Sequence, residues 1–145
     1  MELKIKKVRE NAKIPTRGTA GAAGFDLYAC IDEPLTLHKG DTALIPTGIA
    51  IAVPEAHAAF IHSRSGLSIK KGICLLNSVG VVDSDYRGEV CVGIIKVTDE
   101  PYTIEPFERI AQMVIKAVCI PEITETDELD ETDRGEGGFG STGTK

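Results

Sequence analysis

The hydrophobic and polar positions of the chain form short segments divided by glycine and proline, and this pattern predicts an all-β protein. Leu3–Val8 alternates apolar and charged residues, as a half-buried strand does. Helical periodicity never persists beyond about two turns. Further strands are expected over Phe25–Cys30, Leu35–His38, Asp41–Leu44, Gly48–Val53, Ala58–His62 and Arg109–Ile120. Many short strands separated by turns are typical of a β-sandwich or barrel.

One short helix is expected over Ser63–Gly72, with Ser65 as its N-cap and Gly72 as its end. Arg64 and Ser65 would then lie where the free amides of the helix open, and amides, a hydroxyl and a guanidinium together suit an anion. The alternative is a plain capped turn with a solvated arginine.

The segment Leu75–Glu89 predicts a β-hairpin with a long arm between the strands Ile73–Leu76 and Val90–Val97. Its polar residues, Asn77, Asp83, Asp85 and Tyr86 among them, are interleaved with apolar ones instead of gathering at the tip. The hairpin is therefore either an ordinary surface element or one wall of a polar pocket.

Two polar residues stand inside apolar runs, where each needs a partner. Asp26 lies in a predicted strand, and an unpaired buried charge is costly. It either caps neighbouring amides or serves as a ligand for a metal or its water shell. Gln112 stands in the last apolar run and finds its hydrogen bonds in the backbone or in a ligand.

Pro121 ends the folded pattern, so we predict a β-barrel domain over residues 1–121 and an arm over residues 122–145. Glu122–Asp133 is rich in Asp, Glu and Thr and reads as a linker. Arg134–Gly143 is glycine-rich, which fits either a flexible tail or a flap that closes on a nucleotide. In the second case Phe139 would stack on a base, while Arg134, Ser141 and Thr142 would hold phosphate oxygens.

Composition narrows the class of protein. The 145 residues suit a single domain, and a net charge of −6 argues against a nucleic-acid partner. We expect no membrane span and no signal peptide. The four cysteines form no CxxC pair and are expected to be reduced core thiols of a cytoplasmic protein. The three histidines lack metal-ligand spacing, so we expect them to be structural or exposed.

Five segments, taken in order, resemble the five motifs of the homotrimeric deoxyuridine triphosphatases (dUTPases), and the resemblance spans nearly the whole chain. They are Ala20–Ala29, Ser63–Ser68, Asn77–Gly88, Arg109–Met113 and Arg134–Gly143. The family usually has Ala, Pro or Thr at Ser63 and Ala or Gly at Ser68, and neither difference removes a phosphate-binding group. The resemblance implies a distorted jelly-roll or β-barrel with one short helix and a mobile C-terminal arm.

The resemblance also implies a reaction, in which dUTP and water give dUMP and pyrophosphate with the help of Mg²⁺. This reaction keeps uracil out of DNA and supplies dUMP for dTMP synthesis. Asp83 would be the general base for the water that attacks the α-phosphorus. Asp26 would contact Mg²⁺ through water. The phosphate chain would be held by Arg64, Ser65, Gly66 and Gln112.

By the same resemblance, Asn77 and the hairpin backbone at Gly80 and Val82 would bind uracil, and Tyr86 would lie against the deoxyribose. An apolar pocket rejects an added hydroxyl only about 10²-fold, so stronger discrimination against UTP requires a rigid Tyr86. The arm would contribute Arg134, Phe139, Gly140, Ser141 and Thr142. Arg109 is expected to be structural and to pair with Asp85.

The family is trimeric, with three sites that are each shared between subunits: one supplies the Asp26, Arg64 and Gln112 segments, a second the hairpin and a third the arm. Two alternatives remain. The related dCTP deaminases share the fold but tend to be longer and use a glutamate in place of an Asp83-like base. A non-catalytic nucleotide sensor on the same fold is the other alternative.

Overall fold

The computed structural model describes residues 1–138, which form ten strands and one helix. This confirms the predicted all-β class with one short helix. In chain order the elements are β1 (Lys4–Lys7), β2 (Phe25–Tyr28), β3 (Leu35–Leu37), β4 (Thr42–Ala52), β5 (His57–Ser63), α1 (Ser65–Lys71), β6 (Ile73–Leu75), β7 (Gly80–Val82), β8 (Glu89–Lys96), β9 (Tyr102–Ile104) and β10 (Arg109–Ala117).

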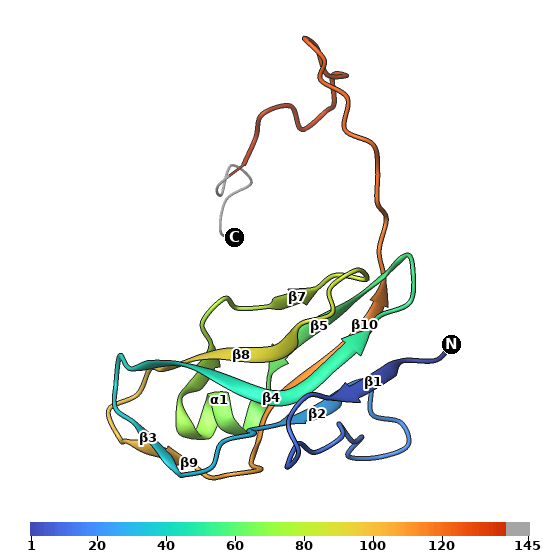
Figure 1. Cartoon of the computed structure of the whole chain (residues 1–145). Helices are drawn as coiled ribbons and strands as arrows, with labels where there is room; N and C mark the ends of the chain where they lie inside the picture. Colours follow the sequence, from blue (N-terminus) through green and yellow to red (C-terminus); the bar gives the residue numbers. More distant parts are fainter. Residues whose placement is uncertain (139–145) are drawn as a thin grey trace.

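The strands form two four-stranded sheets and a small two-stranded one (Figure 1). One large sheet has the order β1-β4-β8-β6, the other has the order β2-β10-β5-β7, and β3 pairs with β9. Apolar side chains from both large sheets, such as Ile51 and Ile94 from the first and Leu27 and Met113 from the second, belong to one buried core. The two sheets therefore enclose a single core between them.

Strand β4 joins two predicted strands, because Asp41–Leu44 and Gly48–Val53 belong to one continuous element. Pro46 lies inside it without ending it, since the register against β8 shifts between Pro46 and Ala50. Such a bulge accommodates a residue that has no N–H to donate. Gly48 in the bulge has φ +73°, and a Cβ there would lie 2.5 Å from that of Ala12, so only glycine fits.

The predicted hairpin is only partly confirmed. Its flanking strands do pair, with Leu75 of β6 opposite Ile94 of β8. Between them, however, β7 leaves this sheet and pairs with β5 of the other sheet, with Gly80 opposite Ile61. Residues 76–88 therefore connect the edges of the two sheets. The sequence contains the strand-forming residues of β7 but not its long-range partner.

The helix begins one position from its predicted cap. Arg64, not Ser65, is the N-cap, because its backbone is still extended (φ −86°, ψ 129°) and continues the direction of β5. Gly72 ends the helix as predicted, in the left-handed conformation with φ 63°. Only Leu67 of this helix is buried.

The cysteine expectation is half right. All four cysteines are free, but only Cys30 is buried, whereas Cys91 and Cys119 are exposed and Cys74 is intermediate. An alternating strand places every second residue on its outer face, so an apolar run does not make each of its thiols part of the core.

After β10 the chain leaves the body as a long segment (Figure 1). Residues 118–138 contain no strand or helix, and every residue of the acidic stretch 122–133 is exposed. None of the helices that the structure describes, within residues 1–138, has the length and apolar character needed to cross a membrane.

Candidate functional site

Polar residues that the sequence singled out come together in a first cleft, which we call the anion pocket, with a volume of about 410 Å³. Its polar wall consists of Asp26, Arg64, Ser65, Arg109 and Gln112. The remaining lining residues are small or apolar: Gly18 and Ala22–Gly24 of the glycine-rich loop, Gly66 of α1 and Val114 of β10. The pocket thus combines two guanidiniums, a hydroxyl and exposed backbone.

Strand pairing positions these side chains. Gln112 of β10 lies opposite Asp26 of β2 on one side and opposite His62 of β5 on the other. The next residues after β5 are Arg64 and the start of α1. Gly24 lies so close to Gln112 that a Cβ at Gly24 would be 2.9 Å from Gln112 Oε1. Three adjacent strands therefore deliver residues 26, 64 and 112 to one place.

Asp26 is held by two guanidiniums. Arg64 Nε donates to Asp26 Oδ1 at 2.9 Å, and Arg109 Nη1 donates to Oδ2 at 3.2 Å. Arg64 Nη1 also donates to the carbonyl oxygen of Arg109 at 3.0 Å. The Asp26 side chain is only 13% exposed, so these ion pairs compensate a carboxylate that is largely removed from water.

This geometry corrects one expectation. Within the described residues of this one chain, Arg109 forms its ion pair with Asp26 and not with Asp85. Asp85 lies on the turn after β7, at the other edge of the sheet from β2. The pairing follows from the register of β10 against β2, which nothing local in the sequence reveals.

Gln112 finds a backbone partner, because its Nε2 donates to the carbonyl oxygen of Ser63 at 3.0 Å. This bond fixes the chain just before α1, where Ser65 and Gly66 are exposed. Of the two options left open for Gln112, the backbone one is present, and the side chain still lines the pocket.

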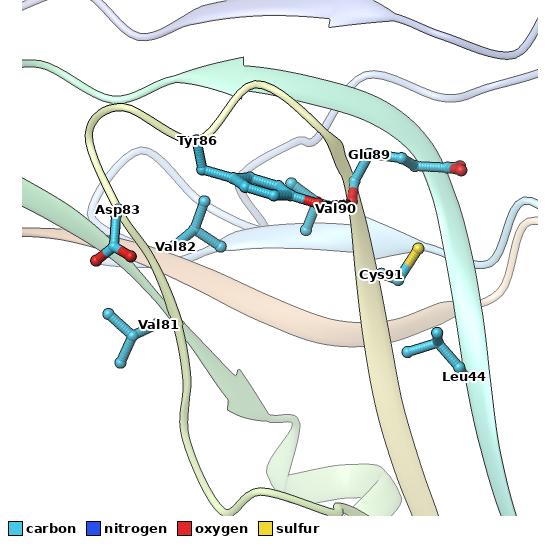
Figure 2. Close-up of a pocket in the computed structure, with 8 residues that line it drawn as sticks. All are labelled: Leu44, Val81, Val82, Asp83, Tyr86, Glu89, Val90 and Cys91. Atoms are coloured by element: carbon cyan, nitrogen blue, oxygen red, sulfur yellow. Dashed lines mark hydrogen bonds between the residues drawn. The ribbon is translucent and has the colours of Figure 1, made fainter.

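A second cleft, the Tyr86 groove, lies between β7, β8 and the turn that joins them, and has a volume of about 320 Å³ (Figure 2). It is lined by Leu44, Val81, Val82, Asp83, Tyr86, Glu89, Val90 and Cys91. The ring of Tyr86 lies across the groove with its hydroxyl toward β8 (Figure 2). The wall is largely apolar, with Asp83 exposed at one end.

Local contacts hold Tyr86 in place. Its hydroxyl donates to the carbonyl oxygen of Glu89 at 3.1 Å, and its backbone N–H donates to that of Asp83 at 3.3 Å. Arg87 Nη1 donates to the carbonyl oxygens of Ser84 and Tyr86 at 2.7 and 2.8 Å. A Cβ at Gly88 would collide with the Tyr86 hydroxyl and ring. Gly88 therefore leaves the space that the ring occupies.

The two clefts do not merge within one chain. Val82 pairs with Ala59 near the start of β5, whereas Arg64 follows its end. Asp83, one residue beyond this pair, is thus about six residues from Arg64 along β5, or roughly 20 Å at the rise of a β-strand.

The other predicted residues are more scattered. Asn77 and Gly80 precede or begin β7 and are not among the residues that line the Tyr86 groove, and Asn77 Nδ2 lies 3.5 Å from the position of a Cβ at Gly80. Arg134 Nε donates to the carbonyl oxygen of Gly137 at 2.7 Å. The arm positions Phe139, Gly140, Ser141 and Thr142 lie outside the described residues.

Sequence reasoning missed an ion pair beside the Tyr86 groove. Glu89 accepts from Arg9 at 2.7 and 3.0 Å and from the Gly48 N–H at 2.8 Å. The hydrogen bond from Arg9 is the main cause that holds the pKa of Glu89 below its usual value, assisted by the Gly48 N–H and opposed by burial. The partners are 80 residues apart, so spacing gave no signal.

The donor set at Asp26 is compatible with Mg²⁺. This ion keeps several waters and typically takes one or two carboxylates together with substrate phosphates. Asp26 offers such an oxygen in a cleft that has room for phosphates. Within residues 1–138, no group of three His, Cys, Asp or Glu side chains could hold a metal ion by itself.

Comparison with known proteins gives a consistent result. The family model described as dUTPase matches residues 10–143. A deoxyuridine 5'-triphosphate nucleotidohydrolase of Hydrogenobaculum sp. is 49% identical and covers the whole of both chains. One of Desulfitobacterium hafniense is 50% identical over 99% of this chain and 97% of its own.

Solved structures agree with these relatives. A mutant dUTPase of Staphylococcus bacteriophage 80alpha with dUpNHpp has a TM-score of 0.89 and 29% identity, over 99% of both chains. A mutant dUTPase of phage phi11 of S. aureus, in which a structural Mg(II) ion is coordinated, has a TM-score of 0.81. It covers 90% of this chain and all of its own, and at 24% identity it supports the fold alone.

Proposed function

This chain belongs to the dUTPase family and hydrolyses dUTP, and we propose that Asp83 activates the water that attacks the α-phosphorus, giving dUMP and pyrophosphate. The strongest support is the sorting of the motif residues into two clefts, one cationic and one largely apolar with a carboxylate at its end. These are the two environments that a nucleoside triphosphate needs: one for its phosphates and one for its nucleoside.

The phosphates bind in the anion pocket. Arg64 is already oriented by Asp26 and by the Arg109 carbonyl, and Ser65 and Gly66, the first two residues of α1, are exposed beside it. Gln112 adds an amide donor at the same wall. Such fixed donors stabilise the charge that develops during phosphoryl transfer without having to reorganise. Asp26 would hold Mg²⁺ through water, and the bound ion would neutralise phosphate charge.

The nucleoside binds along residues 77–89. Tyr86, fixed by its hydroxyl and by Gly88, is the wall that a 2′-hydroxyl would strike. Asn77 and the β7 backbone at Gly80 and Val82 read the uracil edge. Asp83 stands at the end of the groove, where an exposed carboxylate can accept a proton from water.

We further propose that each site is shared between copies in a homotrimer. A base must lie within hydrogen-bond reach of the water it activates, whereas Asp83 and Arg64 of one chain are roughly 20 Å apart. The groove is also bordered by an exposed apolar surface: Leu44, Leu76 and Val81 are 71%, 55% and 57% exposed. An apolar surface of this kind suits contact with a second copy. The acidic linker lets the arm from Arg134 onward reach a neighbouring site.

Mixed oligomers test both parts of the proposal. Asp83→Asn and Arg64→Ala chains are each expected to keep at most about a tenth of wild-type activity alone. Refolded together at equal concentration, they should recover roughly a quarter of wild-type activity, since random assembly pairs an intact groove with an intact pocket in that fraction of shared sites. Recovery is measured as pyrophosphate release from dUTP.

The controls separate the outcomes. Mixing either variant with itself should restore nothing, and size-exclusion chromatography with light scattering should report a trimer throughout. Mixtures that stay inactive although they contain both chains would show that the site lies within one chain. Removal of residues 134–145 should leave the trimer intact but cripple turnover. Assays of ammonia release from dCTP test the deaminase alternative, and no release is expected.

A further inference from the structure

The ion pair between Arg9 and Glu89 lies beside the Tyr86 groove but outside the proposed chemistry. Both nitrogens on one edge of the guanidinium engage both carboxylate oxygens: Arg9 Nε to Glu89 Oε1 at 2.7 Å and Nη2 to Oε2 at 3.0 Å. This paired geometry fixes the orientation of both groups, unlike a single contact between flexible chains. Glu89 borders the groove, but its carboxylate extends away from the Tyr86 ring (Figure 2) and is engaged by Arg9 and the Gly48 N–H.

The pair is anchored to the bulge of β4. The Gly48 N–H donates to Glu89 Oε1 at 2.8 Å, and the Gly48 carbonyl oxygen accepts from the N–H groups of Val8 and Arg9 at 2.8 and 3.2 Å. Thr47, which is 1% exposed, donates its hydroxyl to the Val90 carbonyl oxygen at 2.5 Å. Two segments distant in sequence, residues 8–9 and 47–48, therefore meet at the first two residues of β8.

Tyr86 depends on this same point. The acceptor of its hydroxyl is the carbonyl oxygen of Glu89 itself. The contacts of its carboxylate thus fix the position of Glu89, and the carbonyl oxygen of Glu89 in turn holds the Tyr86 ring. Tyr86 is 45% exposed, so packing alone leaves it free to move.

We propose that Arg9 and Glu89 are positioning residues that set discrimination between deoxyribose and ribose, by holding the start of β8 to which Tyr86 is bonded. The inference rests on the proposed role of Tyr86. Without the ion pair, the Glu89 carbonyl oxygen that accepts from the Tyr86 hydroxyl shifts. The Tyr86 ring can then move aside for the 2′-hydroxyl of a ribonucleotide, and UTP becomes a better substrate. An apolar pocket that is not rigid rejects an added hydroxyl only about 10²-fold.

The test is a double-mutant cycle on kcat/KM for dUTP and for UTP. Arg9→Met should lower the preference for dUTP about tenfold while leaving kcat/KM for dUTP nearly unchanged. Tyr86→Phe, which deletes the hydroxyl, should lower the preference similarly. The double variant should lose no more than either single one, because both changes break one chain of contacts.

Two further variants serve as controls. Lys39→Met removes an exposed ion pair to Asp99 of similar length, 2.8 Å, which lies beyond the end of β8 opposite to Glu89, and should leave the preference unchanged. Arg9→Lys keeps the charge but not the paired geometry, and an intermediate loss is expected even if Arg9→Met folds poorly.

The outcomes separate this inference from the function beneath it. If Tyr86→Phe lowers the preference but neither Arg9 variant does, or if the losses add in the double variant, the positioning role is wrong and the proposed function stands. If the wild-type chain hydrolyses UTP as fast as dUTP, the role of Tyr86 in the proposed function is itself wrong.

Discussion

In the anion pocket, paired strands hold the charged side chains, whereas in the Tyr86 groove a turn and its hydrogen bonds hold the ring. Asp26 and Gln112 face each other across the β2–β10 ladder, and Asp26 is 13% exposed between two guanidiniums. Tyr86 is 45% exposed, and Asp83 beside it is exposed as well.

The difference shows which half of the site is finished within one chain. The pocket has its countercharges and backbone bonds in place, so its geometry is preorganised before any phosphate arrives. The groove presents an open apolar wall and an exposed carboxylate. Both are shielded from water only when a ligand or another chain covers them. In the proposed trimer, the Tyr86 groove would therefore depend on assembly more than the anion pocket would.

The largest expected effect is that of Asp83→Asn in the groove. The variant should fold and assemble normally, because the side chain is exposed, but should lose roughly 10²–10⁴ in kcat with dUTP, the usual contribution of a general base. Asp99→Asn, the same chemical change at an exposed site, is the matched control and should keep its activity. Near-normal turnover of Asp83→Asn would falsify the assignment of the base.

Arg64→Ala tests the other half. It removes the proposed donor for the phosphates and one of the two partners of Asp26, so kcat/KM for dUTP should fall roughly 10–100-fold, as expected for hydrogen bonds to charged groups. The affinity for deoxyuridine, which has no phosphate, should not change. Calorimetric titration with dUpNHpp and with deoxyuridine measures both, and equal losses would show that the pocket and the groove are not separate in function.

Much of this architecture could be predicted from the sequence, because strand alternation and turn chemistry are local. The all-β class and the helix end at Gly72 are examples, whereas the gathering of Asp26, Arg64 and Gln112 is implied only by the resemblance to the dUTPase family. The pairing of β7 with β5 could not be predicted, since register depends on contacts made far along the chain. The Arg109–Asp26 ion pair follows from register in the same way.

Two further predictions, the break of the strand at Pro46 and the N-cap at Ser65, were wrong because of neighbouring structure. Pro46 normally interrupts a strand, yet the bulge in β4 absorbs it, and a bulge depends on what the partner strand does. Ser65 is a good N-cap residue, but the extended backbone of β5 continues through Arg64 and moves the cap by one position. The Arg9–Glu89 pair could not be predicted for two reasons: its partners are 80 residues apart in sequence, and Glu89 also accepts from Gly48 in the bulge of β4.

Gly88→Ala should weaken the groove without affecting the pocket. The added methyl group collides with the Tyr86 hydroxyl and ring, so the ring must shift, and the preference for dUTP over UTP should fall roughly tenfold. Gly18→Ala, in the wall of the anion pocket, is the control, because a Cβ there meets nothing within 4 Å. The measurement is kcat/KM for dUTP and for UTP in both variants. A preference that survives Gly88→Ala would mean that the ring position is not what rejects ribose.

The smallest expected effect is a pH dependence of stability at the anchor of the groove. Because the pKa of Glu89 is lowered in the folded chain, the stabilisation it provides is present above its ordinary value of 4.5 and is lost as the pH falls through the lower folded value. The Tm of Glu89→Gln should therefore lie below that of the wild type near pH 7, and the gap should close below pH 4.5. Asp99→Asn, at an exposed pair, should show little gap at neutral pH. A gap for Glu89→Gln that is equally large in acid would mean that the loss comes from packing rather than from the carboxylate charge, and that the groove is anchored without the ion pair.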